Sequence, residues 1–432
     1  MTECMKSELD IFEKREIQTN ILDNHEVSYK PLASVDNQQL EFIIPGHSEF
    51  YRDLASVKLR IRAKLVKIDG GAVTEADGVK ITGVNNLLHS MFSQCSVYLN
   101  GVSVTSTEDN YHYRAYIETL LYYGRDAAET HLTNNLWYVD TPTTDDHSLN
   151  GKPGNKGYEK RLALVNNGSE FELIGPIHAD IFNLSKLLIN NVEIRIKMIK
   201  SADSFFLYGP DKDSKVTLKI TDATLYMKNV QISPSVLIAH ARTLSHSRAI
   251  YNITRVDLKT FTIPQGSRSI SINNMLIGQI PRRVIFAMVD NDAFAGTFDT
   301  NPFSFKHYSM STFSSYIDGV RKPAEEIACS FGGDRQNTMA YQTLFTGMGI
   351  HHQNNGHLIT SEMYAHGFFL LSFDYTPDAS ADENHSSLVS HGTVAYEIRF
   401  SKPLSTTVTC LVFAEYDANI EIDHQRNVYF EH

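Results

Sequence analysis

Residues 57–65, VKLRIRAKL, alternate strictly between apolar and basic side chains. Successive side chains of an extended chain point to opposite faces, so this period of two predicts a β-strand with one buried face. The outward face of that strand would carry Lys58, Arg60, Arg62 and Lys64. Because a strand with one buried face needs an opposing layer, the pattern is typical of a β-sandwich.

Strand signals recur along the whole chain. Alternation returns at residues 192–198, 216–220 and 394–400, and Asn100-Gly101 predicts a hairpin with a tight type I′ turn. Continuous apolar runs predict strands that are buried on both faces or lie at a contact between domains. These runs are 284–289, 368–373 and 408–413. Many short strands, few helices and long polar loops favour an all-β fold with two sandwiches. The longest of these loops are expected at 140–160 and 374–390.

Two segments favour helix instead. Asp109 is placed to cap a helix with one apolar face, and Gly124 is placed to end it. The apolar face of that helix would hold Tyr113, Tyr116, Ile117, Leu120 and Leu121. Near mid-chain, Ser233 followed by Pro234 is a typical helix start, since serine caps the first turn and proline fits the first helical position.

The mid-chain helix is the expected connector between two domains. It divides the chain into an N-terminal arm at 1–30, a first sandwich at 31–230, a connector at 231–245 and a second sandwich at 246–432. A short internal repeat agrees with two similar halves, although a match of this length arises easily by chance. The repeat is Ala115-Tyr116 before Leu120-Leu121 and Ala340-Tyr341 before Leu344-Phe345.

Composition limits the class of protein. The 432 residues, 42% hydrophobic and 21% charged, suffice for two folded cores. A formal net charge of -11 argues against a protein whose main role is to bind phosphate backbones. Neither a signal-peptide pattern nor an apolar run of membrane-spanning length occurs in the sequence. Four widely spaced cysteines predict reduced thiols in an intracellular environment. They are Cys4, Cys95, Cys329 and Cys410.

Catalytic and metal-binding motifs are absent from the sequence. GxSxG, GxxxxGK[ST] and GxGxxG do not occur, and the 18 histidines include no HxH or HxxxH pair. We therefore predict no catalytic residue, no metal site and no cofactor. A polar cluster near residue 360 leaves one alternative, a metal or acid–base site, although its irregular spacing favours an ordinary polar loop. Its members are His351, His352, His357, Glu362 and His366.

The basic face of residues 58–64 has three interpretations. A solvated outer face is favoured, contact with an acidic surface of an adjacent subunit is second, and direct contact with a genome is third. The acidic residues near the C-terminus are one complement for the second interpretation. They are Glu415, Asp417, Glu421 and Asp423.

Beyond these patterns, the chain resembles the major capsid proteins of Maverick/Polinton elements and the related adintoviruses. The resemblance spans nearly the whole chain and is densest in its first half. It rests on Ser7-Glu8-Leu9-Asp10-Ile11-Phe12, Gln18-Thr19, Phe42-Ile43-Ile44-Pro45-Gly46, Tyr51-Arg52-Asp53-Leu54, residues 85–94 (NNLLHSMFSQ), Asn100-Gly101, residues 113–121 (YRAYIETLL) and Leu136-Trp137. In the second half, residues 368–374, the turn-rich segment after them and 412–416 (VFAEY) resemble closing strands of such a protein.

The resemblance implies a double jelly roll: two tandem eight-stranded jelly-roll β-sandwiches with a few short helices. It also implies a homotrimer with a pseudo-hexameric outline that tiles an icosahedral shell of a double-stranded DNA virus, with assembly inside the host cell. Neighbouring capsomers, a single jelly-roll penton protein and other minor capsid proteins would be partners, without specific nucleic-acid recognition. A packaging ATPase and a maturation protease would be encoded alongside, and the arm at 1–30 would be an interior tether.

Two other classes remain open at this stage. A carbohydrate-binding sandwich would use the long loops for its ligand, but the cysteine usage and the missing signal peptide disfavour an extracellular lectin. A jelly-roll enzyme is disfavoured by the histidine spacing.

Overall fold

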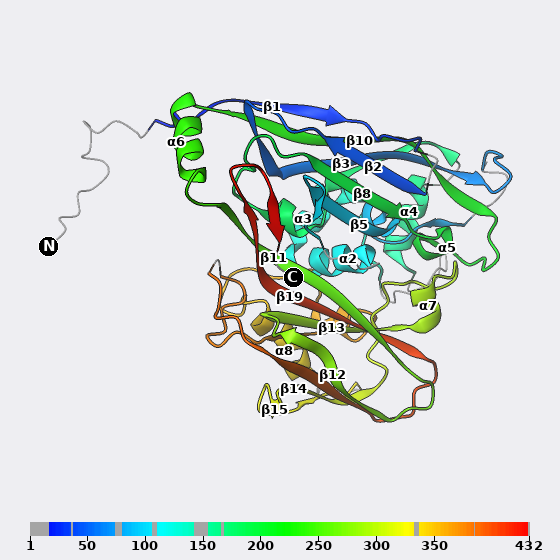
Figure 1. Ribbon diagram of the computed structural model, residues 1–432. Helices are drawn as coiled ribbons and strands as arrows, with labels where there is room; N and C mark the ends of the chain where they lie inside the picture. Colours follow the sequence, from blue (N-terminus) through cyan, green and yellow to red (C-terminus); the bar gives the residue numbers. More distant parts are fainter. Residues whose placement is uncertain are drawn as a thin grey trace, which may run out of the picture.

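The computed structural model describes residues 17–35, 38–73, 80–105, 110–141, 154–165, 168–331, 337–383 and 385–430. Two β-sandwiches lie one against the other, the first built from strands before residue 233 and the second from strands after residue 248 (Figure 1). Helix α6, Pro234–Leu244, stands at one end of the molecule and joins them.

The first sandwich has two four-stranded sheets. The first sheet has the order β1-β10-β3-β7 and the second the order β2-β8-β5-β6, and all neighbouring strands are antiparallel. The strands are β1 Ile21–Tyr29, β2 Gln39–Ile44, β3 Phe50–Lys67, β5 Phe92–Leu99, β6 Val102–Ser103, β7 Phe171–Pro176, β8 Ile194–Lys200 and β10 Val216–Ile232. A separate short pair joins β4, Thr82–Gly83, to β9, Leu207–Tyr208.

The second sandwich has two five-stranded sheets. The first sheet has the order β11-β19-β13-β17 with β20 beside β19, and the second the order β12-β18-β14-β15 with β16 beside β14. The strands are β11 Ala249–Ile263, β12 Ser269–Gln279, β13 Arg283–Asp290, β14 Met310–Ile317, β15 Val320–Arg321, β16 Ile327–Ala328, β17 Leu370–Asp374, β18 His391–Phe400, β19 Val408–Ile422 and β20 Val428–Phe430.

Both sandwiches have the same strand order. If the eight main strands of each are counted along the chain, omitting β4, β9, β16 and β20, both first sheets follow the order 1-8-3-6 and both second sheets 2-7-4-5. The prediction of two tandem eight-stranded sandwiches is therefore confirmed, with β16 and β20 as additions to the second.

Local sequence explains the most regular strands. In β3 the apolar residues of the alternating stretch are at most 1% exposed, while the basic residues between them point outward. The β5–β6 turn has φ 46° at Asn100 and 84° at Gly101, the two positive values of a type I′ hairpin. Asp318 and Gly319, with φ 49° and 79°, form the turn between the corresponding strands β14 and β15.

Short helices fill the connections. They are α1 Leu87–Ser90, α2 Tyr111–Tyr122, α3 Arg125–Glu129, η3 His131–Asn135, α4 Lys156–Val165, η5 Asp180–Asn183, α5 Asp203–Phe206, α7 Asn291–Ala295, α8 Thr338–Gly347 and α9 Ser361–Tyr364. Helices α2 and α8 both lie in the connection from the fifth to the sixth main strand, so the repeat at Ala115 and Ala340 falls at equivalent places.

Three predictions need correction. The arm was expected to reach residue 30, but Ile21–Tyr29 is strand β1, an almost fully exposed edge strand whose polar residues give no alternation. The loop expected at 140–160 ends earlier, because α4 begins at Lys156, where the Asn155 side chain accepts a hydrogen bond from the Tyr158 amide at 3.1 Å. The third correction concerns α2, which is buried on all sides from Tyr111 to Leu121.

Helix α2 lacks the exposed face that its sequence predicted because both sandwiches enclose it. It begins at Tyr111 after Asn110 and ends at Tyr122, two residues before Gly124, while the expected cap Asp109 lies outside the described residues. The mid-chain helix starts as predicted, with Ser233 at the cap and Pro234 in the first turn. Described strands on either side of it pair only within their own side, and the division of the chain into domains at 231–245 stays a prediction.

Candidate functional site

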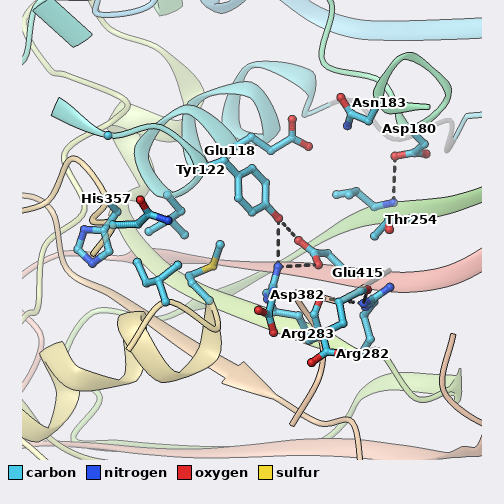
Figure 2. Close-up of a pocket in the computed structure, with 18 of the residues that line it drawn as sticks. Glu118, Tyr122, Asp180, Asn183, Thr254, Arg282, Arg283, His357, Asp382 and Glu415 are labelled. Atoms are coloured by element: carbon cyan, nitrogen blue, oxygen red, sulfur yellow. Dashed lines mark hydrogen bonds and ion pairs between the residues drawn. The ribbon is translucent and has the colours of Figure 1, made fainter. Parts of the chain in front are cut away.

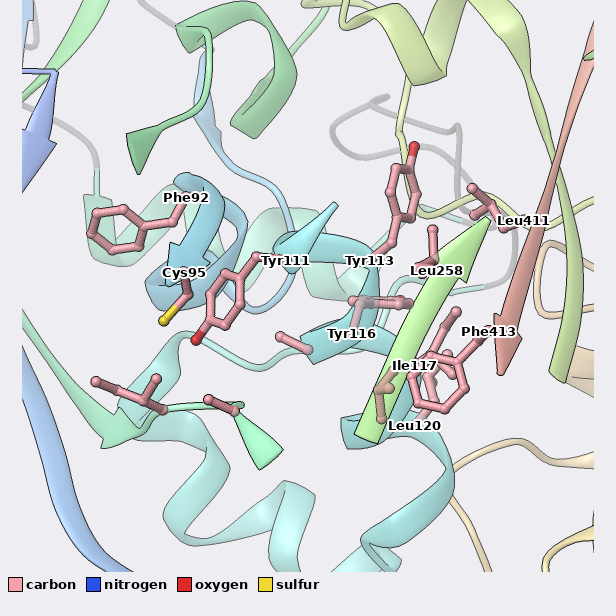
Figure 3. Packing of buried hydrophobic residues seen from close by; sticks show 14 of the residues in the cluster. Phe92, Cys95, Tyr111, Tyr113, Tyr116, Ile117, Leu120, Leu258, Leu411 and Phe413 are labelled. Carbon is pink, nitrogen blue, oxygen red and sulfur yellow. The ribbon is translucent and has the colours of Figure 1, made fainter. Parts of the chain in front are cut away.

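The contact between the two sandwiches brings together aromatic stacking, buried ion pairs and a cavity. Helix α2 of the first sandwich lies against β11 and β19 of the second, and its side chains meet Leu258, Leu411 and Phe413 (Figure 3). Tyr116 stacks on Phe303 with ring centroids 4.1 Å apart and an interplanar angle of 6°. Aromatic pairs in this geometry stabilise a contact beyond the area that they bury.

The same contact explains the continuous apolar runs. Residues 284–289 and 408–413 lie in β13 and β19, adjacent strands of the first sheet of the second sandwich. One face of this sheet packs into its own core, where Phe286 meets Phe313, and the other packs on α2 through Phe413. The prediction that these runs mark two-sided burial or a domain contact is confirmed.

A buried ionic network underlies α2. Arg114 donates to Glu118 at 2.8 Å and to Asp180 at 2.5 Å, and Glu118 contacts His178 Nδ1 at 2.6 Å. The same Asp180 oxygen accepts a hydrogen bond from the Val256 amide of the second sandwich at 3.3 Å. Burial opposes the ionisation of Glu118, but Arg114 and His178 outweigh it and lower the pKa of Glu118 to about 2. The network therefore links the two sandwiches through charge-assisted hydrogen bonds.

Two further buried ion pairs lie at the contact, and one hydrogen bond joins each of them to the other sandwich. Arg283 on β13 donates to Glu415 on β19 at 3.1 Å, and the Tyr122 hydroxyl of α2 also donates to Glu415. The second pair is Arg161 of α4 with Asp140 at 2.6 Å, and both side chains are fully buried. The other Asp140 oxygen accepts a hydrogen bond from the amide of Asn301, in the second sandwich, at 3.1 Å. Loss of one partner of a buried ion pair strongly destabilises a protein. These pairs and their hydrogen bonds across the contact therefore stabilise one relative orientation of the two sandwiches.

A cavity of about 1380 Å³ opens along this contact (Figure 2). Its walls carry both signs of charge, and several of the charged groups there have partners within the chain: Arg283 with Glu415, and Arg282 with Asp417 at 2.7 Å. Within the described residues, no group of three or more His, Cys, Asp or Glu side chains has a geometry that could hold a metal ion.

The histidine cluster near residue 360 does not converge. His351 and His352 lie exposed with ring centroids 4.1 Å apart, whereas His357 turns inward and packs on Phe345 at 4.6 Å. Burial lowers the pKa of His357 to about 4, which keeps it neutral at physiological pH. Glu362 and His366 are exposed on and just after α9. The cluster therefore lies in a polar loop with one buried aromatic contact.

The basic face of β3 is paired with acids of its own chain. Lys58 contacts Glu26 at 2.6 Å, and Arg62 contacts Glu172 at 2.7 Å. Arg60 contacts Asp222 at 3.1 Å. These acids come from strands β1, β7 and β10, the other three strands of the same sheet.

The acidic residues near the C-terminus also have partners. Glu415 and Asp417 pair with Arg283 and Arg282, and Glu421 pairs with Arg248 at 2.9 Å. Asp423 accepts a hydrogen bond from the Asn427 side chain at 2.9 Å. Because Glu415 is buried inside the chain, it is unsuited to receive the basic face of a neighbour.

The described cysteines are free thiols. Cys95, Cys329 and Cys410 are all buried, and burial raises the pKa of Cys95 and Cys329 to about 12. Such thiols are inert and pack as small apolar groups. This agrees with the predicted reduced state, while Cys4 lies outside the described residues.

Sequence patterns had pointed to none of the buried ion pairs. The spacing of Arg114 and Glu118 by four residues on one helix was a usable signal, because such pairs face each other. Arg161 and Asp140 gave no comparable signal, because they lie 21 residues apart in the sequence. Their other partners, Gly83 and Asn301, lie still farther along the chain.

The comparisons with known structures agree with this arrangement. A chain of the Sputnik virophage superposes with a TM-score of 0.66 at 11% identity, over 100% of this chain and 93% of that chain. The fold is a double jelly roll. The mavirus major capsid protein has a TM-score of 0.52 at 9% identity, covering 99% of this chain and 93% of its own. A chain of the PBCV-1 virus capsid has a TM-score of 0.55 at 8% identity, covering 98% and 99%.

At the level of sequence, the relatives of this double jelly roll are distant. An uncharacterized protein of Caenorhabditis elegans is 22% identical over 398 residues, covering 90% of this chain and 92% of its own. No protein-family model matches the chain. The matched mavirus and Faustovirus structures are major capsid proteins. None of the helices in the described ranges is long and apolar enough to cross a membrane.

Proposed function

We propose that this chain is the major capsid protein of a double-stranded DNA virus or virus-like element of the Polinton/adintovirus type. Its role is structural: three copies form a pseudo-hexameric capsomer that tiles an icosahedral shell, and the chain performs no catalysis. The single observation that carries the proposal is the identical strand order of two sandwiches joined through a buried contact. Two similar units in one chain give six similar units per trimer, so threefold association can fill sixfold positions.

Rigidity of the contact supports this role. The α2 aromatic side chains and the pairs at Glu415 and Asp180 hold one relative orientation of the two sandwiches. A shell unit needs such an orientation, because a variable angle between the sandwiches would prevent regular tiling.

The first test is the mass of the purified chain in solution. Size-exclusion chromatography with light scattering should give a stable species of three times the chain mass of 48.7 kDa. Electron microscopy of the same sample should show hexagonally outlined particles or closed shells. A species that remains monomeric at every concentration would refute the proposal, and stoichiometric bound metal would favour a jelly-roll enzyme instead.

The type of element has a separate test. The DNA flanking the coding region should encode a single jelly-roll penton protein, a packaging ATPase and a maturation protease if the element is of the Polinton/adintovirus type. Flanking genes of another viral lineage would leave the capsid role intact and refute the assignment to this type.

The N-terminal segment is proposed as an interior tether to neighbouring capsomers or minor capsid proteins. Because β1 begins at Ile21, a deletion of residues 1–16 removes no described strand, whereas a deletion of 1–30 removes a strand of the first sheet. The shorter deletion should yield trimers that fail to build normal shells. Normal shells from that variant would end the tether proposal.

A further inference from the structure

A groove lined mainly by apolar side chains opens at the end of the molecule where α6 stands. Its volume is about 250 Å³, and it lies between the C-terminal half of α6, the start of β11 and the segment before β8. Ile189, Leu244 and Tyr251 line it and are at most 9% exposed, whereas Ile250, which also lines it, is 48% exposed. A concave apolar surface with an exposed apolar side chain beside it is typical of a site that another segment covers.

The charge along this groove is positive. The described residues that line it include Lys186 and Arg248 but no aspartate or glutamate. Arg248 pairs with Glu421 at 2.9 Å, so its charge is already balanced. Lys186 Nζ donates to the Ile250 carbonyl at 3.0 Å and to Asn252 Oδ1 at 3.3 Å, and neither of these neutral oxygens balances its charge. A segment that fits the groove should therefore combine large apolar side chains with acidic ones.

The chain contains such a segment before its described part. Residues 8–13, ELDIFE, hold three acidic and three large apolar side chains and no basic one, while basic residues flank the segment at positions 6, 14 and 15. An aromatic side chain such as Phe12 is the usual anchor of a segment in a small apolar pocket. The composition of residues 8–13 therefore complements both the apolar lining of the groove and the charge of Lys186.

The path of the described chain brings this segment within reach of the groove. The Ser233 amide donates to the Asn20 carbonyl at 2.8 Å, so the chain before β1 lies beside the first turn of α6 (Figure 1). Helix α6 has 11 residues and is about 16 Å long, and Leu244 lies at its other end, in the groove. The eight residue steps from Asn20 back to Phe12 span about 26 Å when extended. Phe12 can therefore reach the groove of its own chain.

We propose that residues 8–13 dock in this groove of their own chain, with Phe12 as the apolar anchor against Leu244 and Tyr251 and with the acids of the segment around Lys186. The contact lies within a single chain, so the inference does not depend on the proposed trimer. Because the segment is joined to the chain, its effective concentration at the groove is on the order of 1 mM, and a weak contact is enough to fill the site. The proposed tether is compatible with this site, since a segment that docks in its own chain can exchange with that of a neighbour.

Lysine acetylation of the full-length chain tests the docking. Lys186 should react about tenfold more slowly in the wild-type chain than in Phe12→Ala, since an effective concentration on the order of 1 mM protects a site whose dissociation constant is about 0.1 mM by this factor. The control is Met5→Ala, which truncates an apolar side chain outside residues 8–13 and should leave the slow rate unchanged. Lys402, exposed in the 401–407 connection, should react equally in all three chains.

A free peptide supplies a second readout on the same variant. The peptide of residues 7–16, SELDIFEKRE, is acetylated beforehand at its N-terminus and at Lys14, so that only lysines of the protein react. Added at about 1 mM to the Phe12→Ala chain, it should restore the slow reaction of Lys186, because it replaces the effective concentration of the joined segment. The same peptide with Phe12→Ala should have no effect.

The concentration of the chain separates docking within one chain from docking between chains. Docking within one chain slows the reaction of Lys186 equally at every chain concentration. Slowing that appears only as the concentration rises would overturn the inference and show that the segment binds a second copy. Equal rates in wild type and Phe12→Ala, with no effect of the peptide, would overturn it as well. A wild-type chain that never forms trimers would instead overturn the proposed function and leave these rates as they are, so the two failures are distinguishable.

Discussion

Strands β3 and β13 are the third strands of their sandwiches, yet their outer faces differ. Arg60 and Arg62 point outward from β3, and Ile285 and Ala287 take the outward positions on β13, facing α2. The strand order around them is the same, so the fold does not require either chemistry. The difference reflects what covers each face: the rest of the chain covers the outer face of β13, whereas the outer face of β3 is in contact with solvent.

The largest expected effect comes from the outer face of β13 and β19, which packs on α2. Phe413→Ala removes a fully buried ring that packs on α2, and truncation of such a ring costs about 3–5 kcal/mol in free energy of unfolding. Chemical denaturation followed by circular dichroism measures it, with Phe413→Leu as the control that retains most of the volume. An equal and small effect from both variants would show that the contact between Phe413 and α2 is not tightly packed.

A second test separates a buried ion pair from its surroundings. Arg283→Met leaves the Glu415 carboxylate 2% exposed and without its cation, which should cost about 3 kcal/mol, since removal of one partner strands a buried charge. Adding Glu415→Gln to that variant should recover much of the loss, because the stranded charge is removed. The double-mutant cycle is measured by denaturation, and additive losses would show that Arg283 and Glu415 are not coupled.

Buried histidines predict that acid weakens the molecule. Burial lowers the pKa of His112 to about 3, against 6.5 in an unfolded chain, so the unfolded state binds a proton first as pH falls. The contribution of His112 to stability is therefore present above pH 6.5 and declines below it, reaching a loss of about 2 kcal/mol at pH 5. Denaturation at pH 7 and pH 5 checks this, and His112→Gln should show a smaller difference between the two values. A pH dependence unchanged by His112→Gln would contradict the assignment.

Much of the fold could be predicted because its signals are local. Alternation along β3 and the Asn100-Gly101 turn depend only on neighbouring residues, and so does the Ser233-Pro234 helix start. The continuous run in β13 predicted burial on both faces or a contact between domains, because such burial removes the polar positions that mark an ordinary sandwich strand.

The missed elements depend on distant parts of the chain. Strand β1 is held by pairing with β10, nearly 200 residues later, and its exposed polar residues give no alternation. Helix α2 was predicted with one apolar face, but its buried Arg114 and Glu118 are satisfied by Asp180 and His178, which no local pattern connects to them. The candidate site was hardest to predict for the same reason, because all of its ion pairs except Arg114–Glu118 join separate segments of the chain.

The smallest expected effect is on the outer face of β3, which carries charged side chains. Lys58 and Glu26 lie 2.6 Å apart with side chains 42% and 37% exposed, so water and salt screen their attraction. Lys58→Ala should change the free energy of unfolding of the monomer by less than about 1 kcal/mol, and high salt should make even this difference disappear. Denaturation at low and high ionic strength measures both effects. A larger, salt-independent loss would show that the Lys58–Glu26 pair contributes to the stability of the single chain as the buried contact on α2 does.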